Sequence, residues 1–119
     1  MSIQSYQDLR VWQEAMALAE TVYRMTKRFP KDELFGLTSQ MRRASVSIPA
    51  NIAEGYGRES TGAYIQFLRV SQGSLKELET HALLANRVGI LAELDMKMVL
   101  SSAEATGKML RALIRSLEK

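Results

Sequence analysis

Apolar residues recur at intervals of three and four positions along almost the whole chain, and this spacing restricts the fold more than any other feature. Residues at that spacing share one face of an α-helix, whereas a half-buried strand alternates apolar and polar residues. The 119 residues include only two prolines and few runs of β-branched residues, so little in the chain opposes helix. The pattern predicts an all-α protein whose helices each bury an apolar face.

The first half of the chain contains two such segments. The first covers about residues 6–28 and ends at Phe29-Pro30, because the residue before a proline disfavours the helical region. The second begins after residues 31–33, whose acidic side chains suit a helix N-terminus, and ends at the glycine-containing residues 55–57. The first segment carries two adjacent apolar stripes: Leu9, Trp12, Met16, Ala19 and Tyr23, and Val11, Ala15, Leu18, Val22 and Met25.

The second half contains two more segments. The third starts at Ser60 or Thr61, either of which is a suitable N-cap, and Gly89 ends it. Its small residues at positions 71–74 are expected to let another helix approach closely. The fourth follows Ile90-Leu91 and carries apolar residues as far as Leu117.

Four helices of about 20 residues with short connections must fold back on one another. Short connections make consecutive helices antiparallel. The sequence therefore predicts one domain over residues 1–119, an antiparallel up-down-up-down four-helix bundle.

Pro49 lies inside the second segment. It removes one backbone donor and its ring clashes with the carbonyl of Ser45, so we expect a kink in the second helix. The alternative is that the helix stops and restarts with Ser47 as the new N-cap.

Motifs for catalysis or metal binding are missing. A di-iron bundle needs Glu-x-x-His pairs, but the single histidine, His81, stands three positions after Leu78 and four after Glu77. The glycines of residues 55–57 lack the third glycine and the preceding strand of a phosphate loop. We therefore expect no enzyme, no metal and no cofactor, with His81 as a packing or surface residue.

The composition favours a cytosolic protein without a membrane partner. There is no cysteine, hence no disulfide, and no apolar run approaches the ~20 residues that span a bilayer. The N-terminus carries no basic and apolar stretch of the signal-peptide kind. The net charge is +3 and the isoelectric point is near 9.4, values compatible with an anionic partner.

Positive charge is concentrated in residues 24–43, which hold six basic and two acidic side chains, a net +4 in a chain of +3. If the first two helices form a hairpin, this charge gathers at one end of the bundle, where it could neutralise phosphates. The alternative is a solvated face with local ion pairs, in which Arg42 or Arg43 reaches Glu77 or Glu79. The six basic residues are Arg24, Lys27, Arg28, Lys31, Arg42 and Arg43.

One string in the second segment is distinctive: QMRRASVSIPANIAEGYGR, residues 40–58. It resembles the signature of the bacterial four-helix-bundle proteins encoded within 23S ribosomal RNA intervening sequences. DLRVWQEA (residues 8–15) and GSLKELET (residues 73–80) resemble the opening of that family's first helix and the centre of its third. Tyr56 departs from the pattern, because small residues are common at its position.

The resemblance implies a ring, typically a homopentamer. It also implies kinship with the accessory variability determinant of diversity-generating retroelements, which binds nucleic acid beside a reverse transcriptase. By position, the family's polar residues of the second helix are matched here by Arg42, Arg43, Asn51, Glu54 and Arg58.

Two functional hypotheses follow. The first is a non-enzymatic, ring-forming bundle that binds RNA, DNA or a nucleic-acid enzyme through the six basic residues and Arg58. The second is a structural or protein-interaction module without nucleic-acid binding. In either case we expect a set of residues to serve the bundle or the contacts between its copies: Pro49, Asn51, Glu54, Glu77 and Glu79.

Overall fold

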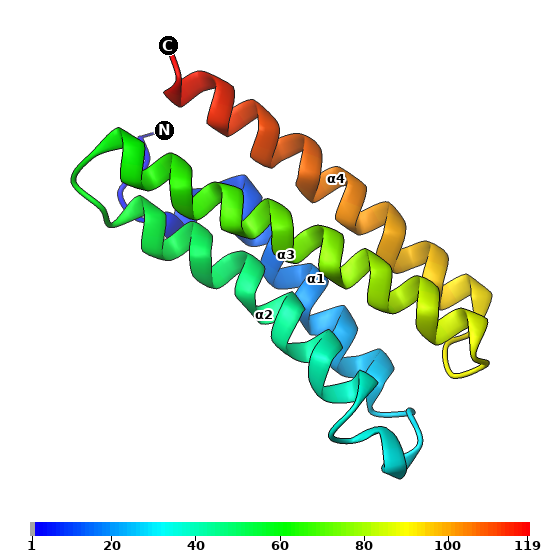
Figure 1. Ribbon diagram of the computed structural model, residues 1–119. Coiled ribbons are helices and arrows are strands. Elements are labelled where there is room, and N and C mark those ends of the chain that lie inside the picture. The colour runs from blue at the N-terminus through cyan, green and yellow to red at the C-terminus, as the bar shows by residue number, and fades with distance from the viewer. Residues whose placement is uncertain (1) are drawn as a thin grey trace.

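The computed structural model describes residues 2–119, and within that range it contains four long α-helices and no strand (Figure 1). Two single-turn 3-10 helices, η1 (Tyr6–Asp8) and η2 (Lys31–Glu33), precede the first two helices. The predicted all-α fold with four helices is confirmed. The helices are α1 (Arg10–Thr26), α2 (Leu37–Tyr56), α3 (Thr61–Arg87) and α4 (Glu93–Leu117).

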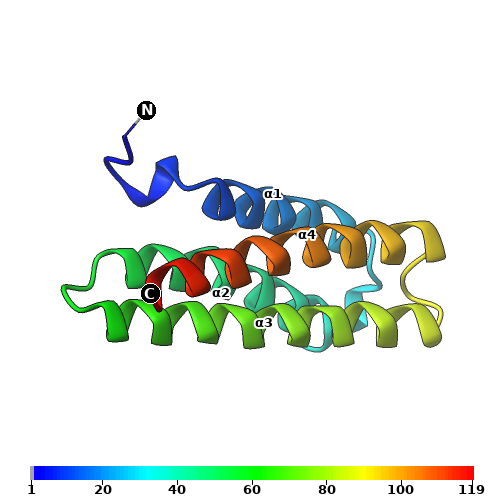
Figure 2. The ribbon, with the colours of Figure 1, turned by 90° about the horizontal axis from the view of Figure 1, so that it is seen from above.

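The helices lie along the length of an elongated bundle of 44 × 23 × 22 Å. Each helix packs against the next one in the chain, and α1 also packs against α4, which closes the bundle. The chain turns back at each connection, so that the α2–α3 turn lies at the opposite end from the α1–α2 and α3–α4 connections (Figures 1 and 2).

The core runs through the middle of the bundle. Of the two stripes predicted on α1, the second is buried throughout, whereas Tyr23 of the first is 41% exposed and Met16 is half-buried. The first stripe therefore flanks the core and leaves apolar surface beside α2. The largest fully buried side chains include Leu18, Val22, Met41, Ile48, Ile52, Leu68, Leu78, Val99 and Leu110.

The first predicted helix is interrupted near its start. Ser5 Oγ accepts a hydrogen bond from the Gln7 amide, and Asp8 Oδ2 accepts from the Ser5 amide, at 3.0 and 3.2 Å. This reciprocal cap completes a single turn. Leu9 is then extended, with φ −74° and ψ 126°, so α1 begins only at Arg10.

α2 continues through Pro49 as one helix. The alternative of a restart capped by Ser47 is therefore wrong, and the Ser47 hydroxyl instead lies 2.8 Å from that of Ser74 on α3. A kink at Pro49 stays a prediction.

α2 and α3 pack closely near their shared turn. A Cβ added at Gly55 would lie 2.8 Å from Phe67 Cβ and 3.2 Å from the Tyr64 carbonyl, so the packing there requires glycine. Ser71 is buried on the same interface and donates a 2.9 Å hydrogen bond to the Ile48 carbonyl. The expectation of close approach holds for Ser71 and its neighbour Ser74 but is wrong for Gly73, which is exposed.

Candidate nucleic-acid interface

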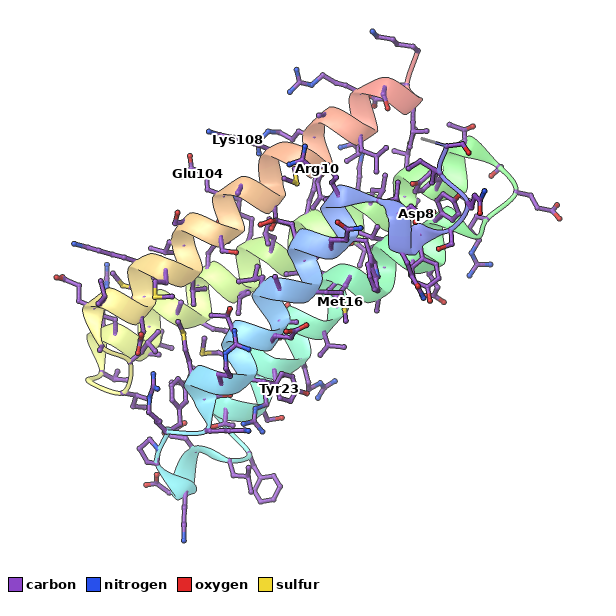
Figure 3. The ribbon with its side chains drawn as sticks, turned by 180° about the vertical axis from the view of Figure 1, so that it is seen from behind. Asp8, Arg10, Met16, Tyr23, Glu104 and Lys108 are labelled. Atoms are coloured by element: carbon purple, nitrogen blue, oxygen red, sulfur yellow. The ribbon has the colours of Figure 1, made fainter. Side chains whose placement is uncertain are left out.

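The six predicted cations lie around the α1–α2 connection. Arg24 is in the last turn of α1, three others belong to the connection, and Arg42 and Arg43 are in the first half of α2. Figure 3 places Tyr23, the neighbour of Arg24, at the end of α1 that leads into this connection, far along the helix from Asp8 and Arg10. The hairpin therefore gathers the cations at one end of the bundle, which we call the basic end: Arg24, Lys27, Arg28, Lys31, Arg42 and Arg43.

Two of these cations have acidic partners. Arg28 lies 3.0 Å from Asp95 in the first turn of α4, and Arg24 lies 4.0 Å from Glu20 one turn earlier on α1. Both arginine side chains remain about 70% exposed, and such exposed pairs are worth little in free energy. They lower the net charge of the basic end without hiding the guanidinium groups.

Arg42 is bound to the surface of α1. Its Nε donates a 2.8 Å hydrogen bond to Thr26 Oγ1, and its guanidinium carbon lies 4.7 Å from the centroid of the Tyr23 ring. Thr26 is buried and its hydroxyl in turn donates to the Val22 carbonyl at 2.8 Å. Arg42 therefore joins α2 to the end of α1, although no carboxylate among the described residues neutralises its charge.

The other three cations of the basic end are exposed. Lys27, Lys31 and Arg43 form no ion pair within residues 2–119. Of the two acidic residues nearby in the sequence, Glu33 accepts a 3.0 Å hydrogen bond from the Leu37 amide and thereby caps α2. These three side chains are the ones free to meet an external anion.

Arg58 lies apart from the other predicted cations. It follows α2 in the turn to α3, at the opposite end of the bundle (Figure 1), and the 15 residues from Arg43 correspond to about 22 Å of helix. Its guanidinium carbon is 4.7 Å from the centroid of the Phe67 ring, and Glu54 is 3.8 Å away. The structure does not bring Arg58 into the basic end.

The residues predicted to serve the bundle or its assembly occupy four places, one of which is Glu54 beside Arg58. Asn51 Nδ2 donates to the Ser47 carbonyl and hydroxyl at 2.8 and 3.0 Å, next to the buried Pro49. Glu77 borders the hollow between α2 and α3. Glu79 borders the one between α3 and α4.

Neither Arg42 nor Arg43 forms an ion pair with a glutamate of α3 within residues 2–119, although the sequence allowed such pairs with Glu77 or Glu79. Glu77 instead lies 3.8 Å from His81, and Glu79 lies 3.2 Å from Lys76. Arg43 borders the same hollow as Glu77 without an ion pair.

Two exposed apolar residues at the basic end were missed in the sequence. Phe35 is 92% exposed and Leu34 is 51% exposed. They stand in the α1–α2 connection just before Gly36, and an adjacent apolar pair directly after the three charged residues 31–33 is the signal that could have found them. Phe35 borders a hollow of about 600 Å³ that Tyr23, Arg42 and Arg43 also line.

His81 is buried at 8% exposure. Its Nδ1 has no hydrogen-bond partner among the described residues. Within residues 2–119, no three metal-ligating side chains cluster. The same part of the chain contains no helix long and apolar enough to cross a membrane.

The molecule is thus a closed bundle of four helices that gathers exposed cations at one end. It belongs to the 23S rRNA-intervening sequence protein family, whose model matches residues 7–112. This confirms the resemblance of the helix-two string, while the relation to retroelement accessory proteins stays a prediction.

A solved structure shares this fold. It is the 1.70 Å crystal structure of a protein of unknown function from the S23 ribosomal protein family of Bacteroides thetaiotaomicron VPI-5482. The two chains superpose with a TM-score of 0.81 over 87% of this chain and 97% of the other, at 21% sequence identity. No curated protein matches the chain.

Proposed function

We propose that this protein binds nucleic acid through its basic end, as a ring of several copies and without catalysis of its own. The observation that carries the proposal is the set of three exposed cations without ion pairs, Lys27, Lys31 and Arg43. Residues 24–43 carry a net charge of +4, whereas the whole chain carries +3, so the remaining residues together carry −1. Phosphates are the anions that such a localised field favours.

Assembly into a ring would multiply this field by the number of copies. Apolar surface outside the core supports contacts between copies. The outer stripe of α1 forms one such surface, where Met16 and Tyr23 line a hollow with Val46 and Pro49 of α2. A ring needs two different surfaces on each copy, and the α3–α4 end supplies a second set of exposed apolar side chains: Leu83, Leu84, Val88, Leu94 and Met98.

The test is binding of fluorescein-labelled RNA and DNA oligonucleotides, followed by anisotropy between about 50 and 200 mM salt, the range over which phosphate contacts lose affinity steeply. The double variant Lys31→Ala/Arg43→Ala should bind more weakly. Its slope of log affinity against log salt should fall by about 0.7–0.9 for each lost phosphate contact.

A matched control removes the same charge elsewhere. Lys108 lies on α4 and is paired with Glu104 one turn before it, at 3.6 Å (Figure 3 labels both). Arg115 is exposed in the last turn of α4, at the opposite end of the bundle from the basic end (Figure 1). Lys108→Ala/Arg115→Ala should leave the slope unchanged. Absence of wild-type binding at 50 mM salt would refute the proposal, and equal losses in both double variants would refute its location.

The rival is a protein-interaction module that assembles without binding nucleic acid. Leu84 and Val88 favour it, because both are exposed and stand one helical turn apart near the end of α3, and exposed apolar patches mark interaction sites. It predicts an oligomer in light scattering and no anisotropy change with any oligonucleotide.

A further inference from the structure

The α1–α2 connection presents an aromatic ring to solvent. Phe35, at 92%, is the most exposed large apolar side chain of the described residues. Removing the apolar surface of a phenyl ring from water is favourable. A partner that covers the Phe35 ring would therefore bind more tightly.

The hollow beside Phe35 combines aromatic and cationic groups. Tyr23 and Val46 give it apolar walls, and Arg42 and Arg43 border it. One face of the Tyr23 ring is covered by the Arg42 guanidinium at 4.7 Å. Phe35 is therefore the ring whose faces are open to a planar partner.

The charges around the hollow select among possible partners. Arg43 borders it, Lys31 lies in the same connection as Phe35, and neither forms an ion pair within residues 2–119. A second copy that presented this same surface would bring the same cations against them, whereas a polynucleotide brings phosphates. Glu33 accepts a hydrogen bond from the Leu37 amide, so this amide is not available to a phosphate.

We infer that this hollow binds single-stranded nucleic acid, with one unpaired base stacked on Phe35 and neighbouring phosphates held by Arg43 and Lys31. Single strands offer base faces to aromatic side chains, and the stacking tolerates any sequence. In a duplex those faces are covered by the neighbouring base pairs. This inference rests on the proposed function and narrows it from nucleic acid in general to unpaired strands.

The experiment compares 12-nucleotide single strands of RNA and of DNA with duplexes of the same sequence, by anisotropy at low salt. Wild-type protein should bind both the RNA and the DNA single strand more tightly than the duplex of the same sequence. Phe35→Ala should weaken binding of the single strands about 5- to 150-fold, the equivalent of about 1–3 kcal/mol per stacked base, and should leave duplex binding unchanged. Phe35→Trp should retain the preference.

Phe35→Leu is the matched control for stacking, because it keeps an apolar side chain and removes the aromatic face. It should behave like Phe35→Ala. Val70→Ala removes an exposed apolar side chain of α3 that does not line the hollow, and should bind like wild type. Since Phe35 and Val70 are exposed, all four variants should keep the helical circular dichroism and the thermal midpoint of the wild type.

Three results overturn the inference. If wild-type protein binds duplexes as well as single strands and Phe35→Ala changes neither, stacking is refuted while the proposed function stands. If wild type binds no oligonucleotide at low salt, the proposed function fails and the inference fails with it. If Phe35→Ala reduces the mass measured by light scattering, the Phe35 side chain is a contact between copies of the protein and not a site for a base.

Discussion

Arg42 of α2 donates a 2.8 Å hydrogen bond from its Nε to Oγ1 of Thr26, the last residue of α1. The same guanidinium lies 4.7 Å from the centroid of the Tyr23 ring. The next residue, Arg43, is exposed and borders the hollow beside Phe35. Two adjacent arginines thus have different surroundings: one joins two helices, and the other faces solvent.

Replacing Arg42 should destabilise the protein. Arg42→Ala removes the hydrogen bond to Thr26 and the contact with Tyr23, and should lower the free energy of unfolding by about 1–2 kcal/mol. Arg43→Ala should change it by less than about 0.5 kcal/mol, as exposed substitutions usually do. Urea denaturation measures both, and equal losses would contradict the division of roles.

Gly55 and Gly73 should respond to alanine in opposite ways. Gly55→Ala would place a methyl 2.8 Å from Phe67 Cβ, and such overpacking costs about 1–3 kcal/mol. Gly73 is exposed inside α3, and nothing described lies within 4 Å of an added Cβ. Gly73→Ala should therefore raise the free energy of unfolding by about 0.5–1 kcal/mol. A thermal midpoint that stays the same or rises in Gly55→Ala would refute the packing assigned to Gly55.

Asn51 should be required as a donor. Its Nδ2 lies 2.8 Å from the Ser47 carbonyl, so Asn51→Asp sets a carboxylate against an acceptor and should cost about 1–3 kcal/mol at neutral pH. Acidification protonates the introduced carboxyl, which can then donate, and should reduce the loss. Asn51→Ala, which introduces no charge, is the control: its loss should be nearly the same at pH 4 and pH 7 in urea denaturation.

Tyr64 should make the stability fall in alkaline solution. Its burial raises its pKa above the ordinary value of 10.0, and Tyr56 adds to the increase. Below about pH 10 both folded and unfolded chains keep the proton, and the contribution of Tyr64 is fully present. Between the ordinary and the raised pKa only the unfolded chain releases the proton, so the free energy of unfolding falls as pH rises. Tyr64→Phe should flatten this part of the curve, and identical slopes would contradict the assignment.

The helices were predictable because their causes are local. Intervals of three and four residues mark an apolar helical face, and Pro30 and Gly89 mark ends, whatever the rest of the chain does. The boundaries were less predictable: the Ser5–Asp8 cap is also local, yet the apolar pattern continues across Leu9 and hid it.

The candidate site was only partly predictable. The concentration of cations in residues 24–43 is a property of the sequence, and the hairpin of α1 and α2 brings them to one end. The resemblance grouped Arg58 with Arg42 and Arg43 among the polar residues of the second helix, but a helix separates positions along its axis. Phe35 was not singled out, because exposure depends on which surfaces pack over a residue.

By itself the sequence determined the four helices, their core stripe and the amount of charge near the first connection, since each depends on residues a few positions apart. Only the tertiary structure decided which charges are free. Arg28 meets Asp95 across 67 positions, Arg42 is bound to Thr26, and Arg43 is left exposed. Such pairings depend on the rotation and register of one helix against another, which the packing of the whole core sets.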